Sequence, residues 1–513
     1  MPKKKAKKKI QKIQKTPSKS FEQVNEEKKP PSRHLMKDFL ASLQLIIPAF
    51  FIILLTAEML KHAYDANVQN LVFPALVLLL GISTIIYTSI SGWITKMPYL
   101  VLPNFFYAFL FVVTGKNYIG HSLHYLFIAT LIGIFAYVIT SFFIKKDLWV
   151  KWIPEPIIKY LPVILSLQMI YFGLLQTGII RLSVLEPIKK TFGSNFFAEG
   201  SYFLLSAENL TAPIFILFIL GLACYLILKK RNIKQAFLWS MLFIVLLGFI
   251  LPMTWTVSSN QISSFRDLTT AAHPYRPQII QMIFGHLFGE SGSMNLSQWG
   301  NFWRLGNIRN FPLIRFSLMT FFFMVFYSVF MHQNIQQAYQ KAHPDLDRKD
   351  IPDATFNRMH AFTGLAGIFS ASALFSYTEH SIMSLFAKGK TNFTGLFTSL
   401  WILIAILLIP FTGFFANPSL IAFIWVVFGI HLLESSGNTL SFKHLQEYLT
   451  LIPMLIIAVT TMNFVESLLL GIFIYSIFDI VLNYKNRKQQ IHPSSYVWIA
   501  VVVLYYLFKI NAF

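Results

Sequence analysis

The stretch MPYLVLPNFFYAFLFVV, residues 97–113, opens an otherwise apolar run with two prolines, Pro98 and Pro103. Proline fixes the backbone φ angle and has no N–H donor, so the residues between them favour extended backbone over the interior of a helix. Within a bilayer, non-helical backbone is tolerated only where protein or a water-filled cavity surrounds it. The stretch therefore predicts a short extended piece buried inside a bundle of membrane helices.

The composition of the whole chain agrees with a membrane location. Its 513 residues are 55% hydrophobic and 16% aromatic with only 13% charged, and the mean hydropathy is +0.57; soluble domains are less apolar and carry about 25% charged residues. Runs such as residues 43–60 approach the roughly 20 apolar residues that cross a bilayer. We count about fourteen such segments between residues 41 and 484. The apolar run at 494–508 is one more, and the sequence does not decide whether it crosses.

The net charge of +21 is concentrated at the amino terminus. Residues 1–37 hold many lysines and are too polar to fold alone, so we predict a disordered cytoplasmic tail that touches anionic lipid and does not bind nucleic acid. Later basic clusters recur on the side of the membrane that this orientation makes internal, and residues 252–310 are poor in Lys and Arg for their length. We expect a multi-pass protein of the cell (inner) membrane with its amino terminus inside.

The chain divides near its middle into two halves of similar size. Residues 38–251 and 311–484 each hold about seven apolar segments, joined by the outer loop 252–310 and followed by the carboxy-terminal residues 485–513. An odd number of spans gives the halves opposite orientations, as in inverted repeats. The predicted fold class is an all-α polytopic membrane protein built as a seven-plus-seven inverted repeat.

A second unusual stretch, FSASALFSYTEHS at residues 369–381, lies at the matching position of the second half. Its small residues permit close backbone approach ahead of Glu379. An ionised carboxylate at the bilayer centre costs about 2.5 to 3.5 kcal/mol on insertion scales, so Glu379 is a candidate functional residue. The alternative is a Glu379 near the end of its span that pairs with a nearby basic side chain.

Several segments resemble those of a known family. ASALFSYTEHSIMSLFAKGKTNFTGL at residues 371–396 resembles the tenth-span signature of AzgA-type purine permeases, in the nucleobase:cation symporter and nucleobase–ascorbate transporter superfamily. MPYLVLPNFFYAF is similar to the third span of that family, and HPSSYVWIAVVVLYYLF at residues 492–508 to its carboxy-terminal part. The resemblance covers most of residues 35–510.

This resemblance implies a transporter with a core and a gate domain, in which short extended pieces of spans three and ten meet at the substrate site. It implies proton-coupled uptake of adenine, guanine or hypoxanthine, without cofactor or metal. Glu379 matches the binding carboxylate, which could accept ring N–H groups and couple its protonation to loading. By analogy of fold alone, a homodimer is expected.

The chain also departs from the family at the expected site. Tyr327 stands where the eighth span of the family has an aspartate, and Asn104 and Tyr107 stand in the third span where glycines allow backbone approach. In the tenth span Phe375 replaces a threonine, beside Ser376. Aromatic rings at these positions could stack on a planar base, or they could fill the cavity and abolish purine binding.

Glu466, at the start of the last span of the second half, is a second candidate for proton coupling; its alternative is a pairing residue at a helix end. Other functions remain open. An anion transporter of the same architecture would present helix amino termini and a cation in place of the acid. A non-transporting receptor would explain the lost polar residues. A membrane transferase would need clustered acids or histidines at one aqueous face, which do not stand out, so we predict that the chain is not an enzyme.

Overall fold

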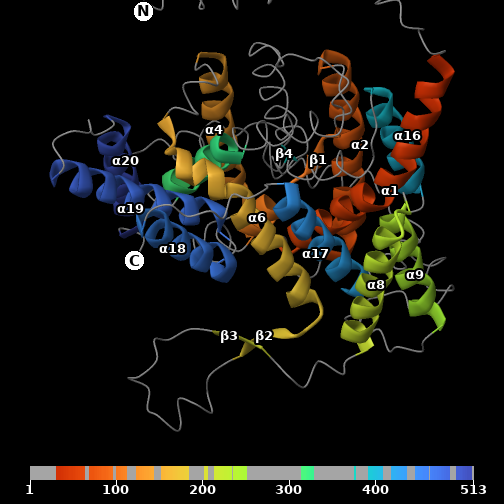
Figure 1. The fold of residues 1–513 in the computed structure, drawn as a ribbon. Helices are drawn as coiled ribbons and strands as arrows, with labels where there is room; N and C mark the ends of the chain where they lie inside the picture. Colours follow the sequence, from red (N-terminus) through yellow and green to blue (C-terminus); the bar gives the residue numbers. More distant parts are fainter. Residues whose placement is uncertain are drawn as a thin grey trace, which may run out of the picture.

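The computed structural model describes fifteen stretches of the chain, almost all of them helical (Figure 1). They are residues 31–63, 69–95, 100–112, 123–143, 152–183, 202–205, 213–233, 235–250, 313–327, 375–376, 391–407, 418–435, 445–461, 463–485 and 493–510. Within them, four helical segments are long and apolar enough to cross a membrane: Leu35–Lys61, Glu155–Gln176, Pro213–Lys230 and Phe464–Val481. Eight shorter apolar helices accompany them. The protein is an all-α polytopic membrane protein, which confirms the predicted class.

The first half contains α1 (Pro31–Lys61), α2 (Gln69–Thr95), β1 (Leu102–Pro103), α3 (Phe105–Leu110), α4 (Leu123–Phe143), α6 (Glu155–Gln176), β2 (Ile180–Ser183), β3 (Tyr202–Leu205), α8 (Pro213–Lys230) and α9 (Ala236–Ile250). The second half contains the helical segment Leu313–Tyr327, β4 (Phe375–Ser376), α16 (Phe393–Leu407), α17 (Pro418–Ser435), α18 (Leu445–Thr461) and α19 (Phe464–Lys485), and α20 (Pro493–Ile510) follows it.

One boundary and one pair of strands differ from the sequence prediction. Helix α1 begins at Pro31, inside the stretch 1–37 assigned to the tail; proline is well suited to the first position of a helix, where its missing N–H has no partner to lose. The antiparallel hairpin of β2 and β3, with Ile180 opposite Leu205, was not predicted. The apolar run at 494–508 forms α20, which packs against α19.

The helices pack as two groups. The first group comprises α1, α2, α3, α4, α16 and Leu313–Tyr327. Helix α1 packs on α2 and α16, and the buried Asp38 of α1 accepts hydrogen bonds from the hydroxyls of Thr391 and Thr394, the latter at 3.0 Å, at the start of α16. Gly133 of α4 lies directly against the Ser317 carbonyl of Leu313–Tyr327.

The second group comprises α6, α8, α9, α17, α18, α19 and α20, and its centre is the crossing of α6 with α17. A Cβ atom added at Gly173 of α6 would lie 2.9 Å from the Ala422 carbonyl oxygen. One added at Gly429 of α17 would lie 2.6 Å from the Ser166 carbonyl oxygen. The two glycines therefore let the backbones approach closely, as in small-residue contacts of membrane helices. Their contacts also show that α6 and α17 run antiparallel.

Contacts between elements repeat in the two halves. In order along each half, α1 corresponds to Leu313–Tyr327, β1 to β4, α4 to α16, α6 to α17, α8 to α18 and α9 to α19. The α1–α16 contact matches that of Leu313–Tyr327 with α4, and α8–α17 matches α18–α6. β1 and β4 pair antiparallel with each other, as do the counterparts α6 and α17. This is the contact pattern of an inverted repeat.

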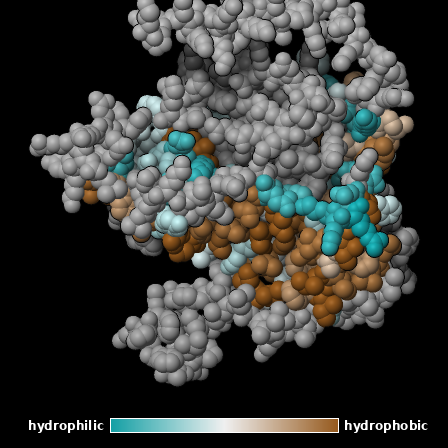
Figure 2. All heavy atoms as spheres, in the orientation of Figure 1, coloured by the Kyte–Doolittle hydropathy of each residue, from teal (hydrophilic) through white to brown (hydrophobic). Residues whose placement is uncertain are grey.

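The outer surface of the second group is apolar. Figure 2 shows hydrophobic side chains over α8 and α9, and the exposed residues of α8 include Ile216, Ile219, Leu220, Leu226 and Ile227. Soluble monomeric proteins rarely expose a contiguous apolar face of this kind, and such a face fits contact with lipid.

Candidate functional site

The candidate site is centred on the pairing of β1 with β4 (Figure 1). Leu102 lies opposite Ser376 and Pro103 opposite Phe375 in an antiparallel register. This confirms that the extended pieces of the third and tenth segments meet. For β4 only the backbone is described, and Glu379, three positions beyond it, lies outside the described residues. Its role and those of the Phe375 and Ser376 side chains stay predictions.

Side chains of the first group hold β1 in its extended form. The Val101 N–H donates to the Thr88 hydroxyl oxygen of α2 at 2.8 Å, and that hydroxyl lies 3.5 Å from the Val101 carbonyl. Leu100, Val101 and Leu102 are all buried. The threonine and the β4 backbone thus supply hydrogen bonds that a helix would otherwise make, which buried backbone in a membrane requires.

Asn104 ends the extended piece and starts α3. It is fully buried, its backbone is extended, and its side-chain oxygen accepts a 2.9 Å hydrogen bond from the Tyr107 N–H, so it is the N-cap of α3. The sequence prediction placed Asn104 at the substrate site. The structure places it beside β1, with this oxygen engaged by the backbone.

Tyr107 ties three elements of the first group together. Its hydroxyl lies 2.7 Å from the Thr320 hydroxyl and 3.4 Å from the Thr130 hydroxyl of α4. The Tyr107 hydroxyl can donate to Thr130, the Thr320 hydroxyl can donate to the Phe316 carbonyl at 3.0 Å, and either hydroxyl can be the donor between Tyr107 and Thr320. Tyr107 and both threonines are buried. The substrate contact predicted for Tyr107 would therefore use a hydroxyl that already has hydrogen-bond partners inside the protein.

Tyr327 belongs to the same aromatic cluster as Tyr107. The Tyr107 ring meets Phe323 edge to face at 5.1 Å, and Phe323 stacks on Tyr327 at 4.9 Å with an interplanar angle of 11°. Tyr327 then meets Phe464 of α19 at 5.7 Å. The cluster links the first group to the second, and it places two of the predicted site residues one ring apart.

The other aromatic residues of α3 face the second group. Phe105 and Phe106 each lie 5.5 Å from the ring of Trp425 in α17, and Phe172 of α6 lies 5.6 Å from it. All but Phe172 are at most 3% exposed, and Phe172 is 7% exposed. The Phe105 and Phe106 rings of α3 therefore pack on other rings of the chain.

Removing the Tyr107 hydroxyl tests this arrangement. In Tyr107→Phe the Thr130 and Thr320 hydroxyls lose a buried partner, so we expect a loss of about 1–3 kcal/mol of stability. Thermal unfolding of the purified protein in detergent measures it. Tyr496→Phe, at a residue that is 53% exposed, is the matched control; equal effects of the two changes would contradict the hydroxyl network.

Glu466 makes an ion pair across the two groups. Its carboxylate accepts a hydrogen bond from Arg315 of Leu313–Tyr327, and the two side chains are 14% and 15% exposed. Asn463 caps α19 by accepting from the Glu466 N–H at 3.2 Å, and the Arg315 guanidinium lies 5.5 Å from the Tyr505 ring of α20. This ion pair agrees with the alternative interpretation of Glu466 as a pairing residue at a helix end. Proton coupling by Glu466 remains a prediction.

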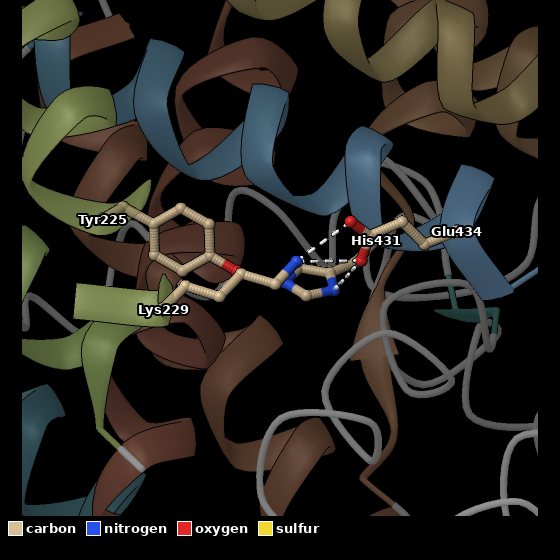
Figure 3. A network of polar contacts seen from close by, with 4 residues as sticks. All are labelled: Tyr225, Lys229, His431 and Glu434. Atoms are coloured by element: carbon tan, nitrogen blue, oxygen red, sulfur yellow. Dashed lines mark hydrogen bonds and ion pairs between the residues drawn. The ribbon is translucent and has the colours of Figure 1, made fainter. Parts of the chain in front are cut away.

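A further polar network joins the ends of α8 and α17 (Figure 3). The hydroxyl of Tyr225 contacts His431 Nε2, and His431 Nδ1 lies 3.3 Å from the Glu434 carboxylate. Lys229 donates to both carboxylate oxygens of Glu434 at 2.9 and 3.0 Å. Sequence reasoning singled out neither this network nor Arg315, Asp38 and the threonines around Tyr107, because isolated polar residues in apolar segments do not identify their partners.

Comparisons with known proteins assign no family. No family model and no curated protein matches the chain. Among solved structures, the transmembrane domain of a cyanobacterium bicarbonate transporter, BicA, aligns with 11% identity over 86% of this chain and 98% of that chain, at a TM-score of 0.47. A likeness at this level decides neither family nor substrate, and the resemblance to purine permeases stays a basis for a proposal.

Proposed function

We propose that the protein is a secondary active transporter with its substrate site at the pairing of β1 and β4. The observation that carries the proposal is extended backbone contributed by matching positions of two inverted halves, β1 and β4, of which β1 is buried. Interrupted helices at the interface of inverted repeats are where such transporters bind substrate and coupling ions. Backbone of this kind is costly in a membrane unless protein or a cavity surrounds it.

The arrangement of the helices supports alternating access. The first group carries β1 and α3, and it meets the second through aromatic rings around Trp425 and Phe464 and through the Arg315–Glu466 pair. We propose that the first group moves against the second and exposes the site to each side in turn. Such a movement changes the ring contacts and leaves the packing inside each group intact.

For the substrate, we propose purine bases taken up together with protons. Glu379 follows β4 by three residues and supplies the acid: the ionised form accepts ring N–H groups, and the protonated form becomes a donor. Because the Asn104 oxygen and the Tyr107 hydroxyl have internal partners, recognition falls mainly on Glu379 and the β4 residues Phe375 and Ser376. The resemblance to AzgA-type permeases supports this choice.

Uptake assays test the proposal. Cells that express the chain should accumulate radiolabelled adenine, guanine or hypoxanthine, a protonophore should abolish the accumulation, and Glu379→Gln should lower it at least tenfold, about 1.4 kcal/mol or more. Glu58→Gln is the control, because Glu58 is 47% exposed and pairs with Lys61 on its own helix. Uptake of bicarbonate or sulfate in place of the bases would overturn the purine assignment in favour of anion transport. A chain that reaches the membrane and moves none of them would contradict transport of these solutes.

A further inference from the structure

The turn between α8 and α9 presents two basic side chains from a fixed backbone. Asn232 has a positive φ of 56°, the Ile233 N–H donates to the Leu228 carbonyl at 3.1 Å, and the Asn232 N–H donates to the Lys229 carbonyl at 3.0 Å. These two bonds form a Schellman motif with asparagine in the left-handed position. The motif ends α8 sharply and fixes the backbone that carries Lys230 and Arg231.

Lys229, the residue before this pair, already has an anionic partner. It donates to both oxygens of Glu434, whose carboxylate also faces His431. The acid near the turn is thus engaged by Lys229, and Lys230 and Arg231 are both exposed. In the part of the chain that the structure describes, neither of these two residues forms an ion pair.

Apolar side chains lie on the same face of α8, one turn away from the cations. Leu226 is 53% exposed and Ile227 is 56% exposed, and residues three and four positions apart are neighbours on a helix surface. Trp239, in the first turn of α9, is 53% exposed. In Figure 2 hydrophilic side chains border the hydrophobic surface over these helices.

We propose that this turn binds an anionic phospholipid. The phosphate lies against Lys230 and Arg231, and the acyl chains lie along Leu226, Ile227 and the indole ring of Trp239. A cationic pair directly above an apolar helix face is complementary to an anionic headgroup with its chains, whereas a zwitterionic headgroup offsets the attraction with its own cation. The site is independent of the transported solute, so its test does not depend on uptake.

The test uses the full-length protein purified in detergent, with bound lipid counted by native mass spectrometry. Phosphatidylglycerol should be retained in preference to phosphatidylcholine, and Lys230→Gln/Arg231→Gln should lower its affinity by about tenfold or more, as expected for two surface cations. Both positions are exposed, so the variant should unfold at an unchanged temperature. Glycerol 3-phosphate at the same concentration should not compete, because it lacks the acyl chains.

The matched control removes the same charge elsewhere, by Arg487→Gln/Lys488→Gln between α19 and α20. This variant should keep the preference for phosphatidylglycerol. Equal loss in both variants would show a general attraction of a cationic protein and overturn the site. Equal retention of phosphatidylcholine and phosphatidylglycerol, or competition by glycerol 3-phosphate, would overturn it as well.

Discussion

Arg315→Gln is expected to destabilise the protein by about 3 kcal/mol, near the lower end of the cost of breaking a buried ion pair from one side. The change leaves the Glu466 carboxylate without its cation at a position where that side chain is 14% exposed. It also removes the guanidinium from the Tyr505 ring. The expected result is a clear fall in the thermal unfolding temperature of the purified protein in detergent.

Three further variants show whether the pair causes the effect. Glu466→Gln should weaken the fold for the same reason, and the double variant Arg315→Met/Glu466→Gln should recover part of the loss, because neither charge is then left alone. Lys61→Gln breaks a pair whose glutamate is 47% exposed, so its effect should be within about 1 kcal/mol. If Arg315→Gln costs no more than Lys61→Gln, the pair between the two groups contributes nothing to stability.

Gly429→Leu is expected to prevent α6 and α17 from packing. A Cβ atom at this position would already lie 2.6 Å from both the Ser166 carbonyl oxygen and the Ile170 side chain, and the leucine adds three more carbon atoms. Overpacking by a few methyl groups costs about 1–3 kcal/mol. A backbone carbonyl cannot move aside as a side chain does, so we expect aggregation or loss of membrane protein for leucine and reduced stability for Gly429→Ala.

Size-exclusion chromatography of the detergent extract measures this outcome. Ala223→Leu on the exposed face of α8 adds the same bulk where lipid can accommodate it, and this variant should elute like the parent protein. A monodisperse Gly429→Leu protein with unchanged thermal stability would refute the close packing of the two helices.

Local sequence features predicted the local structure well. Pro98 and Pro103 bracket the segment that becomes β1, because the restriction that proline places on the backbone acts on its own residue and the one before it. Long apolar runs predicted the helices for a similar reason, since each span must satisfy its own backbone hydrogen bonds in lipid. The prediction that two extended pieces meet came from the order of the spans and from the family resemblance, and the register of β1 with β4 confirms it.

Contacts between distant segments could not be predicted in this way. Arg315 and Glu466 are 151 positions apart, and Asp38 and Thr391 are 353 apart; nothing in the type or spacing of these residues indicates which one meets which. Asn104 was also not predicted as the N-cap of α3, although its hydrogen bond from the Tyr107 N–H is local. The β2 residues alternate apolar and polar side chains, a strand pattern too short to be told from a loop.

The pairing of counterparts bears on how such a chain can arise. β1 with β4 and α6 with α17 are contacts that two copies of an ancestor of half this length would make with each other if they inserted in opposite directions. If the product of such a half-length gene inserted in both orientations, two copies of it would already form these central contacts as a dimer. Duplication and fusion then fix one copy in each direction, and afterwards each half is free to diverge. Today β1 carries Pro103, whereas the candidate acid Glu379 follows its counterpart β4.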